Sequence, residues 1–423
     1  MASAKIFSLE GKGLKLDTAE DIEPHIKALR ENDDVEEVRF LGNTLGIGAS
    51  EALAKVLHTK KKLQIVNFAD IFTSRLLSEI PPALSSLLTA LLALPDLHTI
   101  NLSDNAFGLN TQAPLVTFLA SHVPLRHLIL NNNGLGPAAG VLIADALTVL
   151  AGKKAAARAS GKKVPDLETV ICGRNRLENG SMAAWAKAYA AHTGVREIKM
   201  VQNGIRQEGI AHLLKEGLSQ TTALRVLDLQ DNTFTALGAR ALSDVVGRWP
   251  ELVELGVGDC LLSPRGGVML ATALEKGGNQ KLEVLRLQYN DINAQGVKGI
   301  AGAVEKLPVL RRVELNGNKF SEEEEAIDAL REALGARKEK AGVEDEDDEN
   351  WGLDELDELD SEDENEEDEE GVASDQEEEG VEVEERAARE VADTQKAEEE
   401  PVAQQKDKKV DELADLLGKT EIK

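Results

Sequence analysis

The side chains that most often carry catalysis or bind metal ions are few in this chain, and their spacing suits neither task. Seven histidines and two cysteines, Cys172 and Cys260, form no His-x-x-x-His or Cys-x-x-Cys pair, so we expect no metal site. The segment LLGKT at residues 416–420 ends like a phosphate-binding loop, but Leu413 stands where that loop needs its first glycine. GLGPAAG, from Gly134, resembles a dinucleotide fingerprint whose third glycine comes one residue late. We therefore expect no enzyme active site within this chain.

Polar chemistry is instead concentrated in the stretch LRHLILNNNGLGPAAG, residues 125–140. Three asparagines, Asn131, Asn132 and Asn133, follow an apolar strand pattern there. An asparagine amide donates and accepts hydrogen bonds at once, so it can satisfy backbone groups at a turn or bind a polar partner. The repeat pattern of the chain separates these two uses.

One template, Leu-x-x-Leu-x-Leu-x-x-Asn-x-Leu, explains most of the chain. It recurs ten times, and seven of the nine intervals between its Asn positions are 28 to 30 residues long. This is the signature of a leucine-rich repeat array. Apolar residues ten, thirteen and fourteen positions after the Asn, such as Leu115, Phe118 and Leu119, have helical spacing. The predicted fold class is therefore α/β, a ribonuclease-inhibitor-like horseshoe with parallel strands inside and helices outside.

The Asn position of the template lies where the chain leaves each strand. A buried amide there can bond backbone groups that the strand ladder leaves unpaired, so stacked repeats predict a continuous asparagine ladder. Ile71 and Cys260 occupy this position in two repeats. The predicted ladder residues are Asn43, Asn105, Asn133, Asn175, Asn203, Asn232, Asn290 and Asn318.

The residue before each ladder position is expected to lie on the exposed rim. The template does not specify its side chain, so these residues predict a polar stripe along that rim, with Asn132 in the stripe and Asn133 in the ladder. The alternative is that Asn and Asp stand there for turn-forming reasons alone. The stripe residues are Gly42, Asp70, Asp104, Asn132, Arg174, Gln202, Asp231, Asp259, Tyr289 and Gly317.

Charge divides the chain into a neutral body and an acidic tail. Residues 343–400 hold 31 Asp and Glu against 3 Lys and Arg, which accounts for the whole net charge of -28. We predict a repeat domain of about eleven units over 1–342, with an N-terminal cap, and a disordered tail over 343–400. A further tail over 401–423 could form a short amphipathic helix. Ser361 and Ser374, before acidic runs, are candidate phosphorylation sites.

Two repeat intervals are oversized, at 34 and 42 residues. The first holds DIFTSRLLSEIPP, where the template fails at Ile71. The second holds AGKKAAARASGKKVPD, residues 151–166, which predicts a basic surface loop, either a solvated insertion or a docking site for an acidic surface. No signal peptide or membrane span is predicted, and the two cysteines are expected to be reduced and buried, as in cytosolic or nuclear proteins.

Several segments resemble a known family. They are FADIFTSR, LSDNAFG, NNGLGP, VICGRNRLENGSM, MVQNGIR, LDLQDNTFT, LRLQYN and LNGNKFSEEE. In order and nearly without gaps from residue 5 to about 335, they are similar to the Ran GTPase-activating proteins, especially the fungal type with a repeat domain and an acidic tail. The resemblance implies an activator of GTP hydrolysis by Ran that supports nucleocytoplasmic transport and is not an enzyme in its own right.

The resemblance also implies the roles of particular residues. Matching the family's NNGLGP, Asn132 is expected to orient the catalytic glutamine of Ran, with no arginine finger supplied by the activator. Arg75, in DIFTSR, is expected to bind or orient Ran. Asp70, Asp104, Arg174, Asp231 and Asp259 follow as expected rim contacts to Ran.

Partners and location follow from the same resemblance. We expect no cofactor of the protein's own, because GTP and Mg²⁺ are bound by Ran. Ran-GTP is the expected partner, with or without a Ran-binding protein, and we expect a monomer that binds neither nucleic acid nor membrane. The expected location is the cytoplasm, with shuttling or nuclear-envelope association left open. Two other classes remain as alternatives: an acidic-tailed histone chaperone and a ribonuclease-inhibitor-type inhibitor.

Overall fold

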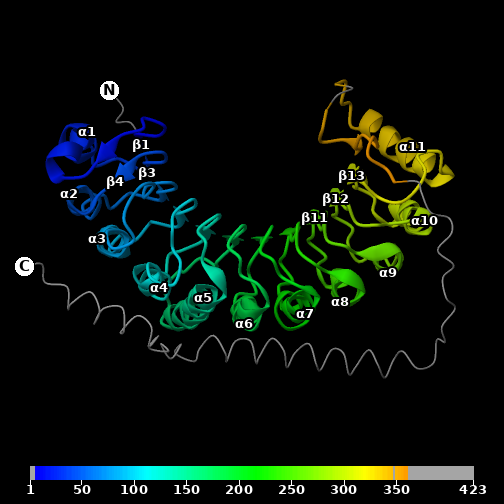
Figure 1. The fold of residues 1–423 in the computed structure, drawn as a ribbon, viewed down its shortest axis with the longest axis horizontal. Coiled ribbons are helices and arrows are strands. Elements are labelled where there is room, and N and C mark those ends of the chain that lie inside the picture. The colour runs from blue at the N-terminus through cyan, green and yellow to red at the C-terminus, as the bar shows by residue number, and fades with distance from the viewer. Residues whose placement is uncertain (1–4, 346–347, 361–423) are drawn as a thin grey trace, which may run out of the picture.

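Parallel strands line the concave face of a horseshoe, and helices form its convex face (Figure 1). The computed structural model describes residues 5–345 and 348–360. Strand, turn and helix follow one another along the chain, so each unit contacts mainly its two neighbours. The predicted fold class is confirmed.

Within the described residues, twelve strands form one parallel sheet and two more form a small second sheet. The central residues of neighbouring strands pair in register, as Leu128 does with Val170 and Val170 with Ile198. The large sheet comprises β1 (Ile6–Ser8), β3 (Glu37–Arg39), β5 (Ile65–Asn67), β6 (Thr99–Asn101), β7 (His127–Ile129), β8 (Thr169–Ile171), β9 (Glu197–Lys199), β10 (Val226–Asp228), β11 (Glu254–Gly256), β12 (Val284–Arg286), β13 (Arg312–Glu314) and β14 (Gly352–Leu353). The small sheet pairs β2 (Lys15–Leu16) with β4 (Thr44–Leu45).

The helices cover the outer side of the sheet, and neighbouring helices pack against one another. They are α1 (Ala19–Glu31), α2 (Ile47–Leu57), α3 (Ile80–Leu92), α4 (Ala113–Leu119), α5 (Gly136–Ala159), α6 (Met182–Ala191), α7 (Gln207–His212), α8 (Thr235–Val245), α9 (Ser263–Glu275), α10 (Ala294–Ala303) and α11 (Glu325–Lys340). Leu115, Phe118 and Leu119, which the helical spacing singled out, are all buried. Each such side chain contributes roughly 1.5–3 kcal/mol through its removal from water.

The N-terminal unit covers the first end of the array. β1 pairs with β3 and begins the large sheet. α1 starts at a capping box, in which the Thr18 hydroxyl accepts from the Asp21 N–H while the Asp21 carboxylate accepts from the Thr18 N–H. The first repeat therefore has its own paired backbone rather than an open edge.

The C-terminal boundary of the repeat domain lies later than the predicted residue 342. β14 adds to β13 in parallel, and three leucines at three-residue spacing pack against the core: Leu353, Leu356 and Leu359. The segment that follows α11 is predicted as part of a disordered tail, because it is highly charged and poor in apolar residues. Packing against the open end of the array corrects that prediction for residues 348–360. Residues 346–347 and 361–423 of the predicted tails, including Ser361 and Ser374, lie outside the described residues.

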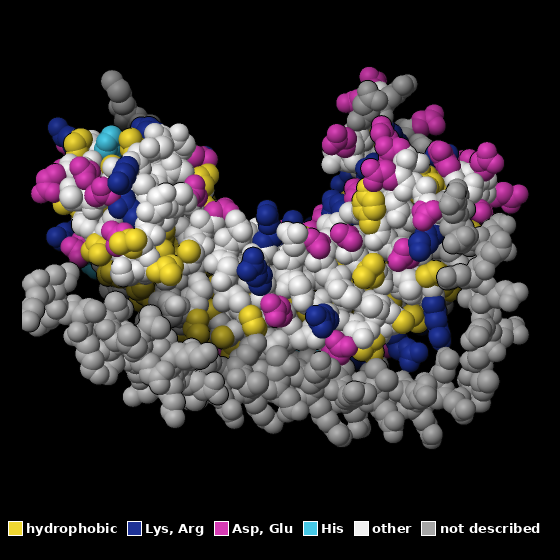
Figure 2. Space-filling view, in the orientation of Figure 1, with side chains coloured by type: hydrophobic (Ala, Val, Ile, Leu, Met, Phe, Trp, Pro, Cys, Tyr) yellow, Lys and Arg dark blue, Asp and Glu magenta, His cyan; other side chains and the backbone are white. Residues whose placement is uncertain are grey.

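This C-terminal segment closes the last repeat with its acidic side chains. Asp354 accepts the N–H groups of Leu315 and Asn316 at 2.7 and 2.9 Å. In the preceding repeat the N–H equivalent to that of Leu315, on Leu287, bonds a carbonyl of the following repeat instead. The Tyr289 hydroxyl donates to Glu358. Asp and Glu side chains gather over this arm of the horseshoe (Figure 2). Residues 348–360 therefore form a C-terminal cap.

The predicted basic loop is largely an extension of α5. Lys154, expected on the surface, is 1% exposed, and its Nζ donates to the carbonyls of Val123, Leu125 and Pro165 at 2.7–2.8 Å. Burial lowers the pKa of Lys154 to about 8. By length and composition alone α5 could cross a membrane, but here it packs between α4 and α6. The insertion is thus anchored to the preceding repeat.

Candidate functional site

The asparagine ladder runs through the turns at the carboxyl ends of the strands. The side-chain Oδ1 of Asn133 accepts the N–H of Asn105, and that of Asn175 accepts the N–H of Asn133, each at 2.9 Å. The same link joins further pairs along the array: Asn175 with Asn203, Asn203 with Asn232, Cys260 with Asn290, and Asn290 with Asn318. At the first unit Asn43 bonds the N–H of Leu14. All eight predicted ladder residues are buried.

The two substitutions in the ladder behave differently. The N–H of Cys260 donates to Asn290 and its thiol contacts the carbonyl of Leu229, so sulfur replaces part of the amide's bonding. Burial raises the pKa of this thiol to about 12, and that of Cys172 also to about 12. Both thiols stay protonated and free. Ile71 retains only the backbone link, through its N–H to Asn105.

The stripe residues share a left-handed backbone, which the sequence analysis did not anticipate. All ten have φ between +47° and +74°. In the eight that are not glycine the N–H group donates to a carbonyl of the next repeat, as those of Asp104 and Asn132 do to Asn131 and Gly173, both at 2.9 Å. Gly, Asp and Asn tolerate this conformation best, and they occupy seven of the ten positions. The turn therefore explains much of the stripe's composition.

Three stripe residues do not follow from the turn. Arg174, Gln202 and Tyr289 are all exposed and have long side chains in a conformation that costs such residues roughly 1–2 kcal/mol. Tyr289 has a structural partner in Glu358. The Gln202 side chain hydrogen-bonds the Asp231 carboxylate. Nothing comparable in the turn accounts for the choice of Arg174, so its side chain is a candidate for contact with a partner.

The three consecutive asparagines have three different environments. Asn131 accepts the N–H of Gly173 at 2.7 Å and so ties its repeat to the next. Asn133 is buried in the ladder. Asn132 is exposed on the rim, where its Nδ2 donates to Asp104 Oδ1 at 2.9 Å. Of the three, only Asn132 is placed to meet another molecule.

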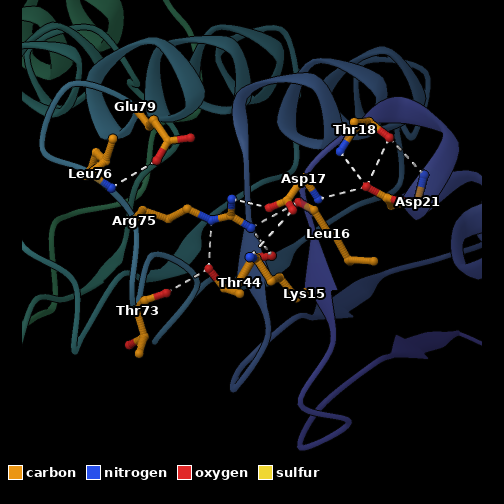
Figure 3. A network of polar contacts seen from close by, with 10 residues as sticks. All are labelled: Lys15, Leu16, Asp17, Thr18, Asp21, Thr44, Thr73, Arg75, Leu76 and Glu79. Carbon is orange, nitrogen blue, oxygen red and sulfur yellow. Dashed lines mark hydrogen bonds and ion pairs between the residues drawn. The ribbon is translucent and has the colours of Figure 1, made fainter.

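Arg75 points into the protein rather than outward (Figure 3). Its side chain is 6% exposed, its Nε donates to Thr44 Oγ1 at 2.8 Å, and its guanidinium pairs with Asp17. A second nitrogen, Nη2, donates to the carbonyl of Thr44 at 3.0 Å. The expected role of Arg75 in binding or orienting Ran stays a prediction. The arginine fastens the loop that follows Ile71, where the ladder has no amide.

The partners of Arg75 were not found by sequence reasoning. Thr44 follows the first ladder residue, and Asp17 lies in the N-terminal cap, 58 residues before Arg75. No periodic pattern links these positions, because the contact spans repeats of different length. The loop carries two exposed leucines, Leu76 and Leu77, on this fixed base.

A hollow of about 460 Å³ lies on the same rim, farther along the array. Gln202, Asp231 and Asp259 contribute to it from the stripe, and Arg176 and Leu261 from the positions after the ladder. Burial raises the pKa of Asp231, as does the nearby Asp259 carboxylate, while a hydrogen bond from Gln202 opposes the shift. With Glu178, which also lines it, the hollow presents three carboxylates against the one guanidinium of Arg176, a balance that favours a cationic group.

Comparisons with known proteins agree with this architecture. A model of the Leucine Rich repeat matches residues 222–243 and 278–301. Ran GTPase-activating protein 1 of Saccharomyces cerevisiae is 42% identical over 336 residues, which cover 77% of this chain and 81% of the yeast protein. The chain belongs to the family of Ran GTPase-activating proteins. The Ran GTPase-activating protein of Drosophila melanogaster is 35% identical over 75% of this chain and 53% of its own length.

A more distant similarity is also found. The ribonuclease inhibitor of Sus scrofa is 26% identical over 73% of this chain and 71% of its own length. In this Ran GTPase-activating protein family member, Asp104 and Asn132 lie in direct contact, Arg174 is exposed, and Asp231 and Asp259 share the hollow.

Proposed function

We propose that this protein accelerates GTP hydrolysis by Ran. Family membership supports the reaction, and one observation carries the assignment of the site: Asn132 is an exposed amide held on the rim in a left-handed turn. An amide can orient a second amide because it offers both a donor and an acceptor. In this proposal Asn132 holds the catalytic glutamine of Ran against the attacking water, and Ran itself supplies GTP and Mg²⁺.

The proposal includes no arginine finger. An arginine finger must reach the phosphates of the partner, whereas Arg75 is fastened inward to Thr44 and Asp17. Arg174 is the exposed arginine nearest in the stripe, and we assign it to binding. Asp70, Asp231 and Asp259 are proposed as further contacts to basic or hydrogen-bonding groups of Ran.

The proposal extends to the cellular role, the oligomeric state and the association of the protein with its partners. A Ran activator that acts in the cytoplasm would support nucleocytoplasmic transport by converting Ran-GTP on that side of the nuclear envelope. We propose that it acts as a monomer, with or without a Ran-binding protein. The acidic arm in Figure 2 supports long-range attraction of basic partner surfaces, which raises association rates and weakens with salt.

Single-turnover hydrolysis by GTP-loaded Ran tests the proposal directly. Ran alone, Ran with this protein, and a second small GTPase with this protein form the three arms. We expect acceleration of Ran and none of the second GTPase. The similarity to ribonuclease inhibitor supplies a further arm, inhibition of pancreatic ribonuclease, and histone binding at moderate salt supplies another. An unchanged Ran rate would overturn the proposal, and either of those activities would then point to the alternative class.

A further inference from the structure

Asp104 and Asn132 occupy equivalent positions in neighbouring repeats. Their backbones share the left-handed conformation, with φ of +59° and +53°, and each N–H is bonded to the next repeat. Parallel strands in register place such equivalent residues side by side. The two side chains therefore leave the rim together, and Asn132 Nδ2 donates to Asp104 Oδ1 at 2.9 Å.

This contact determines which way the amide faces. The side chain of an asparagine can turn by half a rotation and exchange its NH₂ group with its oxygen, at little cost in solvent. An ionised carboxylate only accepts hydrogen bonds, so it selects the orientation in which NH₂ faces it. Hydrogen bonds to charged groups are also stronger than those between neutral groups. The Asn132 oxygen is thereby turned away from Asp104.

We propose that Asp104 is a positioning residue, which holds the Asn132 amide with Oδ1 directed toward the partner. Asn132 then offers a hydrogen-bond acceptor to the NH₂ group of the partner's glutamine, and the glutamine oxygen is left to accept from the attacking water. This inference rests on the proposed function. It assigns to Asp104 a role that acts through Asn132, distinct from the simple rim contact predicted from the sequence.

The surrounding contacts make the pair rigid on its inner side. The N–H of Asn131 donates to Ser103 Oγ at 3.1 Å, and Asn131 Oδ1 accepts the N–H of Gly173. The segments on which Asp104 and Asn132 stand are thus joined directly as well as through the strands. Freedom remains chiefly in the two exposed side chains, which is the freedom that their mutual hydrogen bond restricts.

Steady-state kinetics over a range of Ran-GTP concentrations tests this role. We would compare the parent with Asp104→Gly, Asp104→Asn, Asn132→Gly and the double variant Asp104→Gly/Asn132→Gly. Glycine occupies the same stripe position at Gly42 and Gly317, so it removes the side chain without straining the turn. We expect Asp104→Gly to lower kcat about tenfold with KM changed less than twofold. Asp104→Asn keeps an acceptor and should recover most of kcat.

The double variant separates positioning from contact. If Asp104 acts through Asn132, removing Asp104 has no further effect once Asn132 is glycine. Asp96→Asn is the matched control, because Asp96 is an exposed carboxylate in the same repeat but before strand β6, at the opposite edge of the sheet. We expect its kinetics to equal those of the parent. A raised KM with unchanged kcat in Asp104→Gly, or additive losses in the double variant, would overturn the inference alone.

A measurement without Ran keeps the inference testable on the free protein. The side-chain amide signal of Asn132 in a nitrogen-15 spectrum, assigned by its loss in Asn132→Gly, should shift and exchange faster with solvent in Asp104→Gly. An unchanged signal would show that Asp104 does not hold the amide. A parent protein that leaves Ran's rate unchanged would overturn the proposed function, and with it this role of Asp104.

Discussion

The asparagine ladder and the polar stripe are neighbouring lines of residues with opposite properties. Asn133 is buried and bonds backbone groups of its own array, whereas Asn132, one position earlier, is exposed and bonds a side chain. The same residue type serves both lines because an amide suits a turn as well as a partner. Burial and the direction of the side chain, rather than residue type, therefore distinguish an asparagine that stabilises the array from one that is free to bind a partner.

Removing the stripe amide should give the largest effect. Asn132→Gly is expected to slow Ran hydrolysis at saturating protein at least 100-fold, about 3 kcal/mol of barrier, as for other groups that act only in the transition state. The melting temperature should stay within about one degree, since glycine suits the turn and the lost hydrogen bond is exposed. Single-turnover rates and thermal unfolding check both expectations. Retained acceleration would remove Asn132 from the site.

Removing the adjacent ladder amide should give the reverse pattern. Asn133→Ala deprives the buried N–H of Asn105 of its acceptor and the carbonyl of Leu130 of a donor. We expect a loss of about 2–3 kcal/mol in the free energy of unfolding. Asn133→Cys, which the array itself uses at Cys260, should cost less. Urea unfolding checks this, and a fully stable Asn133→Ala protein would contradict the role of the ladder.

In the C-terminal cap the carboxylate of Asp354, rather than an asparagine amide, accepts backbone N–H groups. Asp354→Ala leaves the N–H groups of Leu315 and Asn316 without their acceptors and should cost about 1–2 kcal/mol. The loss of stability should be confined to the last repeats. Hydrogen exchange of the amides in α10 and α11 measures it. A chain that ends after residue 360 should keep the stability of the parent. Equal stability in a chain ending after residue 342 would contradict the cap.

At the amino ends of the strands, opposite the turns that hold the asparagine ladder, one buried side chain is a histidine that can gain a proton. His122 Nε2 bonds the carbonyl of Leu97 at 2.7 Å, and burial lowers its pKa to about 4 from 6.5. Because the unfolded chain binds the proton first, stability is full above pH 6.5 and declines as pH falls toward 4.

We expect His122 to account for a loss of about 1 kcal/mol between pH 7.5 and 5.5. His122→Asn copies Asn279, which bonds two carbonyls at the equivalent position, and should reduce this dependence. Urea unfolding at the two pH values measures it. An identical pH dependence in parent and variant would assign the loss to other groups, among them His192, whose pKa burial also lowers.

The smallest expected effect concerns Arg174, a stripe residue whose left-handed backbone conformation disfavours a long side chain. Arg174→Gly relieves the left-handed strain and should stabilise the fold by about 0.5–1 kcal/mol. The same variant should raise KM for Ran-GTP with little change in kcat. Arg174→Lys is the control, because lysine keeps the positive charge and is strained in the left-handed conformation as arginine is. A collapse of kcat in Arg174→Gly would instead indicate an arginine finger at this position.

The repeat period was readable from the sequence because it is a local property. Each unit carries its own strand, turn and helix pattern, so the fold class, the eight ladder asparagines and the buried helix positions could be predicted. The left-handed backbone of the stripe could not be predicted. In eight of the ten stripe residues this conformation accompanies an N–H group that donates to the next repeat, which a single unit does not show.

Contacts between distant units were decided only by the tertiary structure. Arg75 turned inward because Thr44 and Asp17 lie beside it in space, and Lys154 was buried by three carbonyls of neighbouring segments. Residues 348–360 folded onto the array because the last repeat left backbone N–H groups unpaired. Composition and period describe what a unit prefers by itself. Which polar group remains exposed depends on the neighbours that stacking brings to it.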